Sequence, residues 1–110
     1  MSTKLKYLAL PYTDPDPEVM RQRFELANRT AALLMKNGML IYSPISHSHP
    51  IAQYGLPLDW EYWQHYDKEI LSICDELIII LAPGWDRSNG VQAEMDLAKG
   101  LGIKISYYAL

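Results

Sequence analysis

The chain has 110 residues, of which 49% are apolar and 21% charged, a composition typical of one globular domain, expected to span residues 1–110. The formal net charge of −3 argues against nucleic-acid binding, because nucleic-acid-binding proteins carry a basic surplus. The longest apolar run, Leu77 to Pro83, is too short to cross a bilayer. The single cysteine, Cys74, excludes an internal disulfide, and no signal-peptide pattern is present, so we expect a cytoplasmic protein.

The first predicted elements are a short buried strand, Tyr7–Leu10, and a helix that follows a proline-rich loop. Asp16 suits the N-cap of that helix and Pro17 its first position. The apolar residues that follow recur every three or four positions and share one helical face: Met20, Phe24, Ala27, Ala31 and Leu34. Asn37-Gly38 ends the helix, and a second strand is predicted over Met39–Tyr42.

The middle of the chain is predicted to form a loop, Ile45 to Pro57, and then a helix, Leu58 to Cys74. The loop contains His47 and His49 in the sequence Ser-His-Ser-His-Pro. Such a pair can bind zinc, but no third ligand is evident nearby. We therefore expect the two imidazoles to line the mouth of a pocket, and we expect neither a metal nor a cofactor. The thiol at the end of the helix is expected to be buried.

The last third of the chain contains the clearest strand, Glu76–Ala82, which is apolar on both faces like a central parallel strand. A helix is predicted over Gly90–Lys99, with Asn89 and Gln92 forming its capping box. A final strand is predicted over Ile103–Tyr108.

Strands that alternate with helices predict an α/β fold, a Rossmann- or flavodoxin-like three-layer sandwich. We expect a short parallel sheet in the order 2-1-3-4. Ligands of such sheets bind beyond the carboxyl ends of the strands at the switch point, here between the first and third strands. The loops Pro11–Asp16 and Pro83–Asn89 follow those two strands, so the site is predicted between them.

Two carboxylates are the candidate reactive groups. Glu94 is predicted about one turn inside the last helix, where the helix dipole favours the ionised form of a nucleophile. Asp67 shares a helical face with Trp60 and Trp63, and poor solvation there favours the protonated form of a general acid. The alternatives are a solvated glutamate, and an interaction domain in which the two tryptophans form core or dimer contacts.

Residues near the start of the last helix suit an anion such as phosphate. Ser88, Asn89 and Gly90 would present free backbone N–H groups, although capping requires only Asn89. Arg87 either neutralises a phosphate or is solvated. The Tyr7 hydroxyl would lie beside the switch point, where it either hydrogen-bonds a carboxylate or packs as a core tyrosine.

Three segments, in this order along the chain, resemble the nucleoside 2-deoxyribosyltransferase family and the related 2'-deoxynucleoside 5'-monophosphate N-glycosidases. They are Lys6–Tyr12, Asp67–Asp75, and Ser88–Ala98 with the following Gly102–Ile105. The similarity covers nearly the whole chain. One departure is Ala9-Leu10-Pro11, which stands where the family commonly has a glycine-rich loop.

The resemblance implies a retaining double displacement at the anomeric carbon of a nucleoside or nucleotide. Glu94 would attack that carbon, Asp67 would protonate the departing base, and Tyr7 would orient Glu94. The two loops and the aromatic helix face would supply the substrate contacts: Pro11, Tyr12, Trp63, Asp86, Ser88, Asn89 and Gly90. A serine six residues before the glutamate is associated in the N-glycosidases with the phosphate end, which favours a nucleotide and hydrolysis.

The resemblance also implies a homo-oligomer, a dimer or larger, because family members build their sites across subunit interfaces. The expected partner is a small-molecule nucleoside or nucleotide, with no nucleic acid and no membrane. The altered first loop favours an alternative, a non-catalytic nucleotide-binding or sensing module that uses the same pocket.

Overall fold

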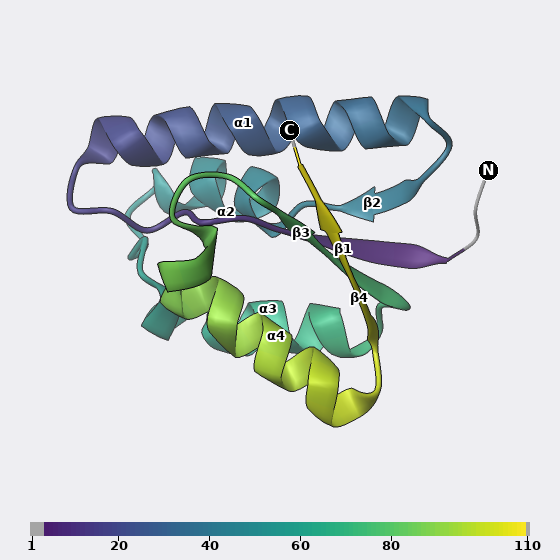
Figure 1. The fold of residues 1–110 in the computed structure, drawn as a ribbon. Coiled ribbons are helices and arrows are strands. Elements are labelled where there is room, and N and C mark those ends of the chain that lie inside the picture. The colour runs from purple at the N-terminus through teal and green to yellow at the C-terminus, as the bar shows by residue number, and fades with distance from the viewer. Residues whose placement is uncertain (1–3, 110) are drawn as a thin grey trace.

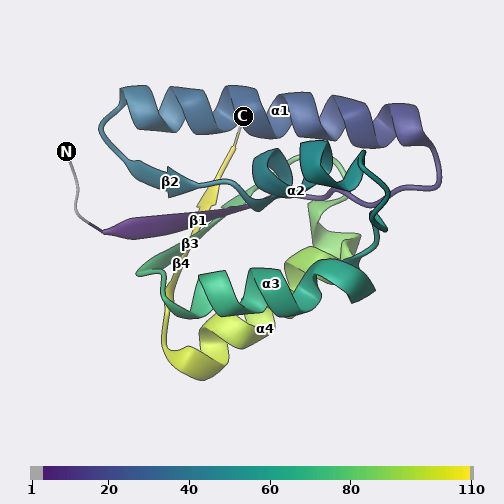
Figure 2. The same ribbon diagram turned by 180° about the vertical axis from the view of Figure 1, so that it is seen from behind.

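The computed structural model describes residues 4–109 as a four-stranded, all-parallel sheet with helices on both faces (Figures 1 and 2). The strands pair in the order β2-β1-β3-β4. Their bounds are β1 (Leu5–Ala9), β2 (Leu40–Tyr42), β3 (Glu76–Ile80) and β4 (Lys104–Tyr108). The predicted fold class and strand order are confirmed, including the contact between the first and third strands.

Two helices cover each face of the sheet (Figure 1). The helices α1 (Pro17–Lys36) and α2 (Pro44–Ala52) lie on one face, and α3 (Trp60–Ser72) and α4 (Asn89–Leu101) lie on the other. A short 3-10 helix, η1 (Trp85–Arg87), precedes α4. None of the helices described for residues 4–109 is long and apolar enough to cross a membrane.

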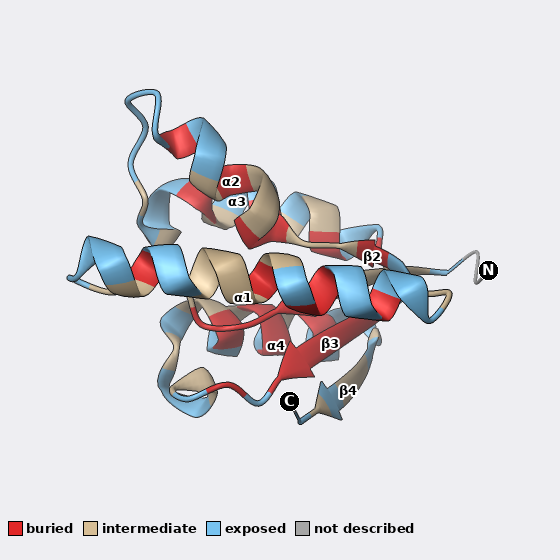
Figure 3. Cartoon of the chain, turned by 90° about the horizontal axis from the view of Figure 1, so that it is seen from above, coloured by how far each residue is buried: buried red, intermediate tan, exposed pale blue. Residues whose placement is uncertain are grey.

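The alternation of sheet side chains produces two cores. Leu8, Ile78 and Ile80 point toward α1 and α2, whereas Tyr7 and Ile79 point toward α3 and α4. β3 is buried along its whole length because it is a central strand, while the edge strand β4 is partly exposed (Figure 3). Burial on both faces explains why this strand is the most continuous apolar segment of the sequence.

The start of α1 follows the predicted chemistry. The Asp16 carboxylate accepts a hydrogen bond from the backbone N–H of Glu18 at 2.9 Å, and Pro17 occupies the first helical position. The buried residues of α1 include four of the five predicted apolar positions: Met20, Ala27, Ala31 and Leu34. The fifth, Phe24, is partly buried against the same core.

The predicted loop over residues 45–57 is wrong in its first half, which forms α2. Ser43 lies at the N-cap and Pro44 at the first helical position, a pairing that favours a helix start. Ile45, Ser48 and Ala52 then fall on one buried face. Burial of that face against α1 and the sheet stabilises a helix that has little intrinsic propensity.

The predicted capping box of α4 is also wrong. Ser88 is the N-cap, and its Oγ accepts a hydrogen bond from the backbone N–H of Val91 at 3.2 Å. Asn89 is already helical, and the Gln92 amide instead donates to the backbone carbonyl of Asp86 at 3.1 Å. The helix therefore begins one residue earlier than predicted.

Candidate active site

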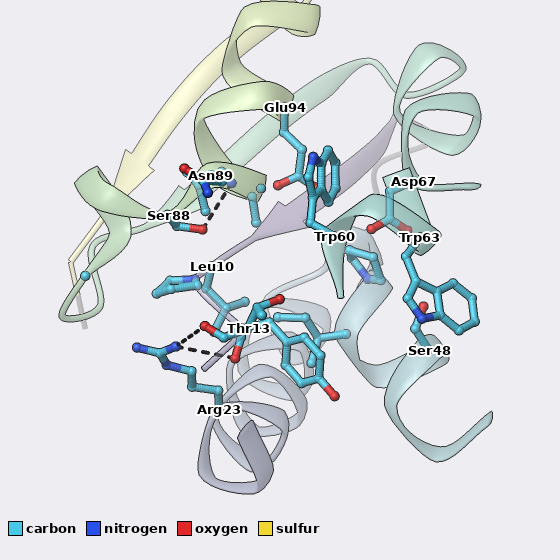
Figure 4. A pocket seen from close by; sticks show the side chains of 18 of the residues that line it. Leu10, Thr13, Arg23, Ser48, Trp60, Trp63, Asp67, Ser88, Asn89 and Glu94 are labelled. Atoms are coloured by element: carbon cyan, nitrogen blue, oxygen red, sulfur yellow. Dashed lines mark hydrogen bonds between the residues drawn. The ribbon is translucent and has the colours of Figure 1, made fainter. Parts of the chain in front are cut away.

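A pocket of about 640 Å³ lies beyond the carboxyl ends of β1 and β3, where the switch point predicts a site (Figure 4). Its volume falls in the range of small-molecule sites. Its lining includes eight of the ten predicted site residues: Pro11, Tyr12, Trp63, Asp67, Ser88, Asn89, Gly90 and Glu94. Of the other two, Tyr7 contacts Glu94, whereas Asp86 is exposed and does not line the pocket.

Glu94 is held at the pocket by a contact between α4 and the sheet. Its side chain is only 5% exposed, and its carboxyl group accepts a hydrogen bond from the Tyr7 hydroxyl on β1. Tyr7 is fully buried. Burial and the neighbouring carboxyl groups of Glu94 and Asp67 raise the pKa of Tyr7 well above its usual value. The raised pKa favours the protonated phenol, which is the form that donates this hydrogen bond.

Burial also dominates the protonation of Glu94. The pKa of its carboxyl group is raised from 4.5 to about 8, and desolvation is the largest cause. The hydrogen bond from Tyr7 acts to lower this pKa, and the charge on Asp67 acts to raise it. Burial therefore opposes the ionised form that the helix dipole favours.

Asp67 lies on the inner face of α3 and is 9% exposed. Burial raises the pKa of its carboxyl group from 3.8 to about 7, the direction predicted from its aromatic surroundings. Its Oδ1 atom has no hydrogen-bond partner among residues 4–109. Trp60 and Trp63 line the pocket beside it, so the shared helical face predicted from the spacing contributes to this cavity.

The two tryptophans are fixed by different contacts. The Trp63 indole N–H donates to the backbone carbonyl of Pro57 at 2.8 Å. Trp60 packs over Gly90, where an added Cβ would lie 3.3 Å from the indole Cε3. A methyl group at residue 90 would therefore require the Trp60 indole to move by a few tenths of an ångström.

The opposite end of the pocket suits an anion. Ser88, Asn89 and Gly90 place the N-terminus of α4 in the lining, and Arg23 and Arg87 also line the cavity. Asp14 also lines the cavity and pairs with Arg23, so the exposed Arg87 and the helix N-terminus are the features that favour a negatively charged ligand group.

Arg23, which the sequence did not predict, also holds the first loop. Its Nη1 donates to the backbone carbonyls of Tyr12 at 3.3 Å and Thr13 at 3.1 Å, and it lies 4.0 Å from an Asp14 carboxylate oxygen. These contacts connect α1 to the rim of the pocket. No spacing pattern indicates them, because they depend on how the loop folds back over the helix.

The two histidines do not line the pocket, contrary to prediction. His49 Nδ1 lies 2.6 Å from the Tyr12 hydroxyl, and its ring stacks on Phe24 with centroids 4.3 Å apart. His47 stacks on Tyr66 with centroids 5.1 Å apart. Because residues 44–52 are helical, it is the intervening residue, Ser48, that lines the pocket.

Ser48, Pro44 and Ile45 are the lining residues that the sequence analysis missed on α2. The signal that identifies them is the Ser43-Pro44 helix start, since the helical period then places residues 45 and 48 on one face. The side chain of Cys74 is buried as predicted, and its Sγ contacts the backbone carbonyl of Ile70 at 3.2 Å. Among residues 4–109, no group of three or more His, Cys, Asp and Glu side chains is placed to hold a metal ion.

Comparison with solved structures identifies the same fold in a 2-deoxyribosyltransferase from the psychrotolerant bacterium Bacillus psychrosaccharolyticus. The TM-score is 0.67 at 19% sequence identity, and the match covers 96% of this chain and 72% of that one. The resemblance drawn from the sequence is thus confirmed at the level of the fold. No curated protein sequence matches the chain.

A family described as a domain of unknown function, DUF1937, matches residues 4–110. Because this match spans nearly the entire sequence, the chain belongs to the DUF1937 family.

Proposed function

We propose that the protein cleaves or transfers the N-glycosidic bond of a nucleoside or nucleoside 5'-monophosphate by a retaining double displacement. The observation that supports this proposal is a pair of buried carboxyl groups, Glu94 on α4 and Asp67 on α3, that line one pocket. Retaining glycosidases use two carboxyl groups in this way, one as nucleophile and one as acid and base. The fold shared with a 2-deoxyribosyltransferase agrees with the assignment.

In the first step, the Glu94 carboxylate attacks the anomeric carbon and forms a C–O bond to the sugar. The C–N bond to the base breaks, and its electron pair moves to the base nitrogen as Asp67 donates a proton to the base. The hydrogen bond from Tyr7 holds the attacking carboxylate in one orientation. Glu94 thereby carries the sugar as a glycosyl ester.

In the second step, water or a second base attacks the anomeric carbon from the face that the first base left. Asp67, now ionised, accepts the proton of the incoming group, and the bond between Glu94 and the sugar breaks. Two inversions give net retention. Water as acceptor makes the protein a hydrolase, and a second base makes it a transferase.

The cycle requires one proton on the pair, held by Asp67, whereas the higher pKa of Glu94 places that proton mainly on Glu94, so substrate binding must move it to Asp67. Burial raises the pKa of Asp67 to about 7. Burial and the negative charge on Asp67 together raise the pKa of Glu94 to about 8, against the lowering effect of the Tyr7 hydrogen bond. The two groups therefore titrate as a coupled pair. We expect a bell-shaped dependence of kcat/KM on pH, with its maximum close to neutrality.

The cationic end of the pocket favours a nucleoside 5'-monophosphate over the free nucleoside. Arg87 immediately precedes the Ser88 N-cap, and Arg23, which pairs with Asp14, also lines the cavity. A phosphate there would accept hydrogen bonds from the N-terminus of α4. The same family resemblance leads us to propose a cytoplasmic homo-oligomer, whose size light scattering would measure.

The test is incubation of the protein with matched ribo- and deoxyribonucleosides and their 5'-monophosphates, followed by chromatography for free base. Glu94→Gln should abolish release and Asp67→Asn should reduce it by at least about a hundredfold, the upper range of general acid–base contributions. Intact mass spectrometry should detect the glycosyl ester in the parent protein and not in Glu94→Gln.

Two exposed residues supply matched controls for these variants. Glu69→Gln on α3 and Asp96→Asn on α4 make the same chemical changes outside the main pocket. Both should release base at the parent rate. Undiminished release by Glu94→Gln would eliminate the proposed nucleophile.

One observation favours a second function, a non-catalytic nucleotide-binding or sensing module. The raised pKa of Glu94, about 8, leaves its carboxyl group mainly protonated at neutral pH in the ligand-free protein. A neutral carboxyl group is a hydrogen-bond donor rather than a nucleophile. This alternative predicts that nucleotides raise the melting temperature without any release of base, and detection of free base excludes it.

A further inference from the structure

Buried polar side-chain atoms in folded proteins nearly always have hydrogen-bond partners. Among residues 4–109, four such atoms have none: Tyr42 Oη, His47 Nδ1, Ser48 Oγ and Asp67 Oδ1. Two of these residues, Ser48 and Asp67, also line the main pocket, and they are only 7% and 9% exposed. Both atoms are shielded as the side chains stand, and a rotation that turns either one into the cavity would let a polar group of a bound ligand become its partner.

Ser48 and Asp67 lie on the same side of the pocket, although they come from different helices. Figure 4 shows both on the side of Trp63, whereas Ser88 and Asn89 lie across the cavity. Pro44, Ile45 and the tryptophan rings supply apolar walls around them. The lining on this side therefore suits a flat, uncharged ring that carries polar substituents at its edge.

The proposed reaction indicates which part of the substrate occupies this side of the pocket. Asp67 donates its proton to the departing base, so the base must lie against Asp67, while the anion of a nucleotide would lie near Ser88. Ser48 is then a neighbour of the base and not of the sugar or the phosphate.

We propose that Ser48 is a specificity-determining residue, whose hydroxyl group hydrogen-bonds an exocyclic amino or oxo group of the departing nucleobase. This inference rests on the proposed function and names the part of the substrate that the α2 side of the pocket recognises. A serine hydroxyl both donates and accepts, so it selects for a polar substituent without distinguishing amino from oxo groups. A base analogue that lacks the polar substituent would leave the buried hydroxyl group of Ser48 without a hydrogen-bond partner. The site should therefore discriminate against such an analogue.

The experiment compares substrates with and without the polar substituent at C6 of a purine or C4 of a pyrimidine. The 2'-deoxynucleosides of adenine and hypoxanthine are compared with that of unsubstituted purine, and those of cytosine and uracil with that of 2-pyrimidinone, which lacks the C4 substituent and keeps the 2-oxo group. The proteins are the parent, Ser48→Ala and Ser48→Thr, which keeps the hydroxyl group. Ser46→Ala is the matched control, because Ser46 lies on the same helix but hydrogen-bonds Asn28 at 2.5 Å and does not line the pocket.

Ser48→Ala should lower kcat/KM about tenfold for the substituted bases and less than about threefold for the unsubstituted ones, the effect of one lost hydrogen bond. Ser48→Thr should retain the parent preference, and Ser46→Ala should leave it unchanged even if its melting temperature falls. An equal loss for both classes of base, or no loss, overturns the proposal.

A failure of the proposed function remains distinguishable from a failure of this inference. If the parent protein releases no base from any substrate, calorimetry with the free bases replaces the kinetic measurement. The parent should then bind adenine or cytosine more tightly than purine or 2-pyrimidinone, and Ser48→Ala should remove the difference. Equal binding of both classes by the parent, or no binding of any base, overturns the assignment of Ser48.

Discussion

The hydroxyl group of Tyr7 on β1 donates a hydrogen bond to the carboxyl group of Glu94 on α4, across 87 positions of sequence. Both side chains are buried, Tyr7 completely and Glu94 to all but 5%. The contact therefore joins a central strand to a helix at the pocket and is largely shielded from bulk water. A reactive group positioned by rigid elements in this way keeps one orientation through a reaction.

Replacing Tyr7 with phenylalanine should change both the rate and its pH dependence. The hydrogen bond favours the ionised form of Glu94 and lowers its pKa, so Tyr7→Phe raises that pKa further. We expect kcat near neutral pH to fall about tenfold with little change in KM, and the rising limb of the pH profile to move to higher pH. Tyr62→Phe, at an exposed tyrosine of α3, should match the parent in both respects.

The raised pKa of Glu94 should also make the stability of the protein depend on pH. The folded-state value is about 8 and the usual value is 4.5, so the folded protein binds the proton more tightly than the unfolded chain. The stabilisation is complete below the unfolded pKa and is lost as pH rises through the folded pKa, with a slope of at most about 1.4 kcal/mol for each step of one in pH. The free energy of unfolding should therefore fall between about pH 5 and about pH 9.

Glu94→Gln isolates this effect, because glutamine does not ionise. Its melting temperature relative to the parent should rise as the pH increases from about 5 to about 9. Asp96→Asn, an exposed acidic residue on the same helix, should show no such trend. A pH-independent difference between Glu94→Gln and the parent would mean that Glu94 titrates normally in the folded protein.

The fold could be predicted because local signals and tertiary packing agree along most of the chain. The Asp16 cap, the apolar face of α1 and the buried strand Glu76–Ile80 each appear as short-range patterns. Residues 45–52 instead resemble a loop, because two histidines, two serines and a proline dominate them. The helix that they form is stabilised mainly by burial of its inner face, which depends on partners distant in sequence.

The candidate site, like the fold, could be predicted in part from the sequence. The switch-point argument and the residue spacing place Glu94 and Asp67 at one pocket, as the structure has them. The contributions of Ser48 and Arg23 were missed, because they depend on α2 and on the path of the first loop. The effect of burial on the pKa of Glu94 was missed, since burial is a property of the assembled fold.

The rim of the pocket should loosen when Tyr12 loses its hydroxyl group. Tyr12 lines the pocket, and its Oη lies 2.6 Å from His49 Nδ1 on α2, so this contact ties the first loop to a helix. Tyr12→Phe should raise KM about threefold to tenfold with little change in kcat, the loss of one hydrogen bond that positions the loop. Tyr54→Phe, at a side chain 92% exposed, is the control and should leave KM unchanged. A fall in kcat at constant KM would contradict a role in substrate access.

Replacement by alanine should affect ligand binding at one glycine of α4 and protein stability at the other. In Gly90→Ala, the new Cβ would lie 3.3 Å from Trp60 Cε3, so the indole must shift within the pocket. In Gly100→Ala, the new Cβ meets no atom within 4 Å, and alanine should stabilise the helix by about 0.5–1 kcal/mol. We therefore expect Gly90→Ala to weaken nucleotide binding, measured by calorimetry, whereas Gly100→Ala should raise the melting temperature and leave binding unchanged. Equal affinities for all three proteins would show that the ligand does not contact the Trp60 side of the pocket.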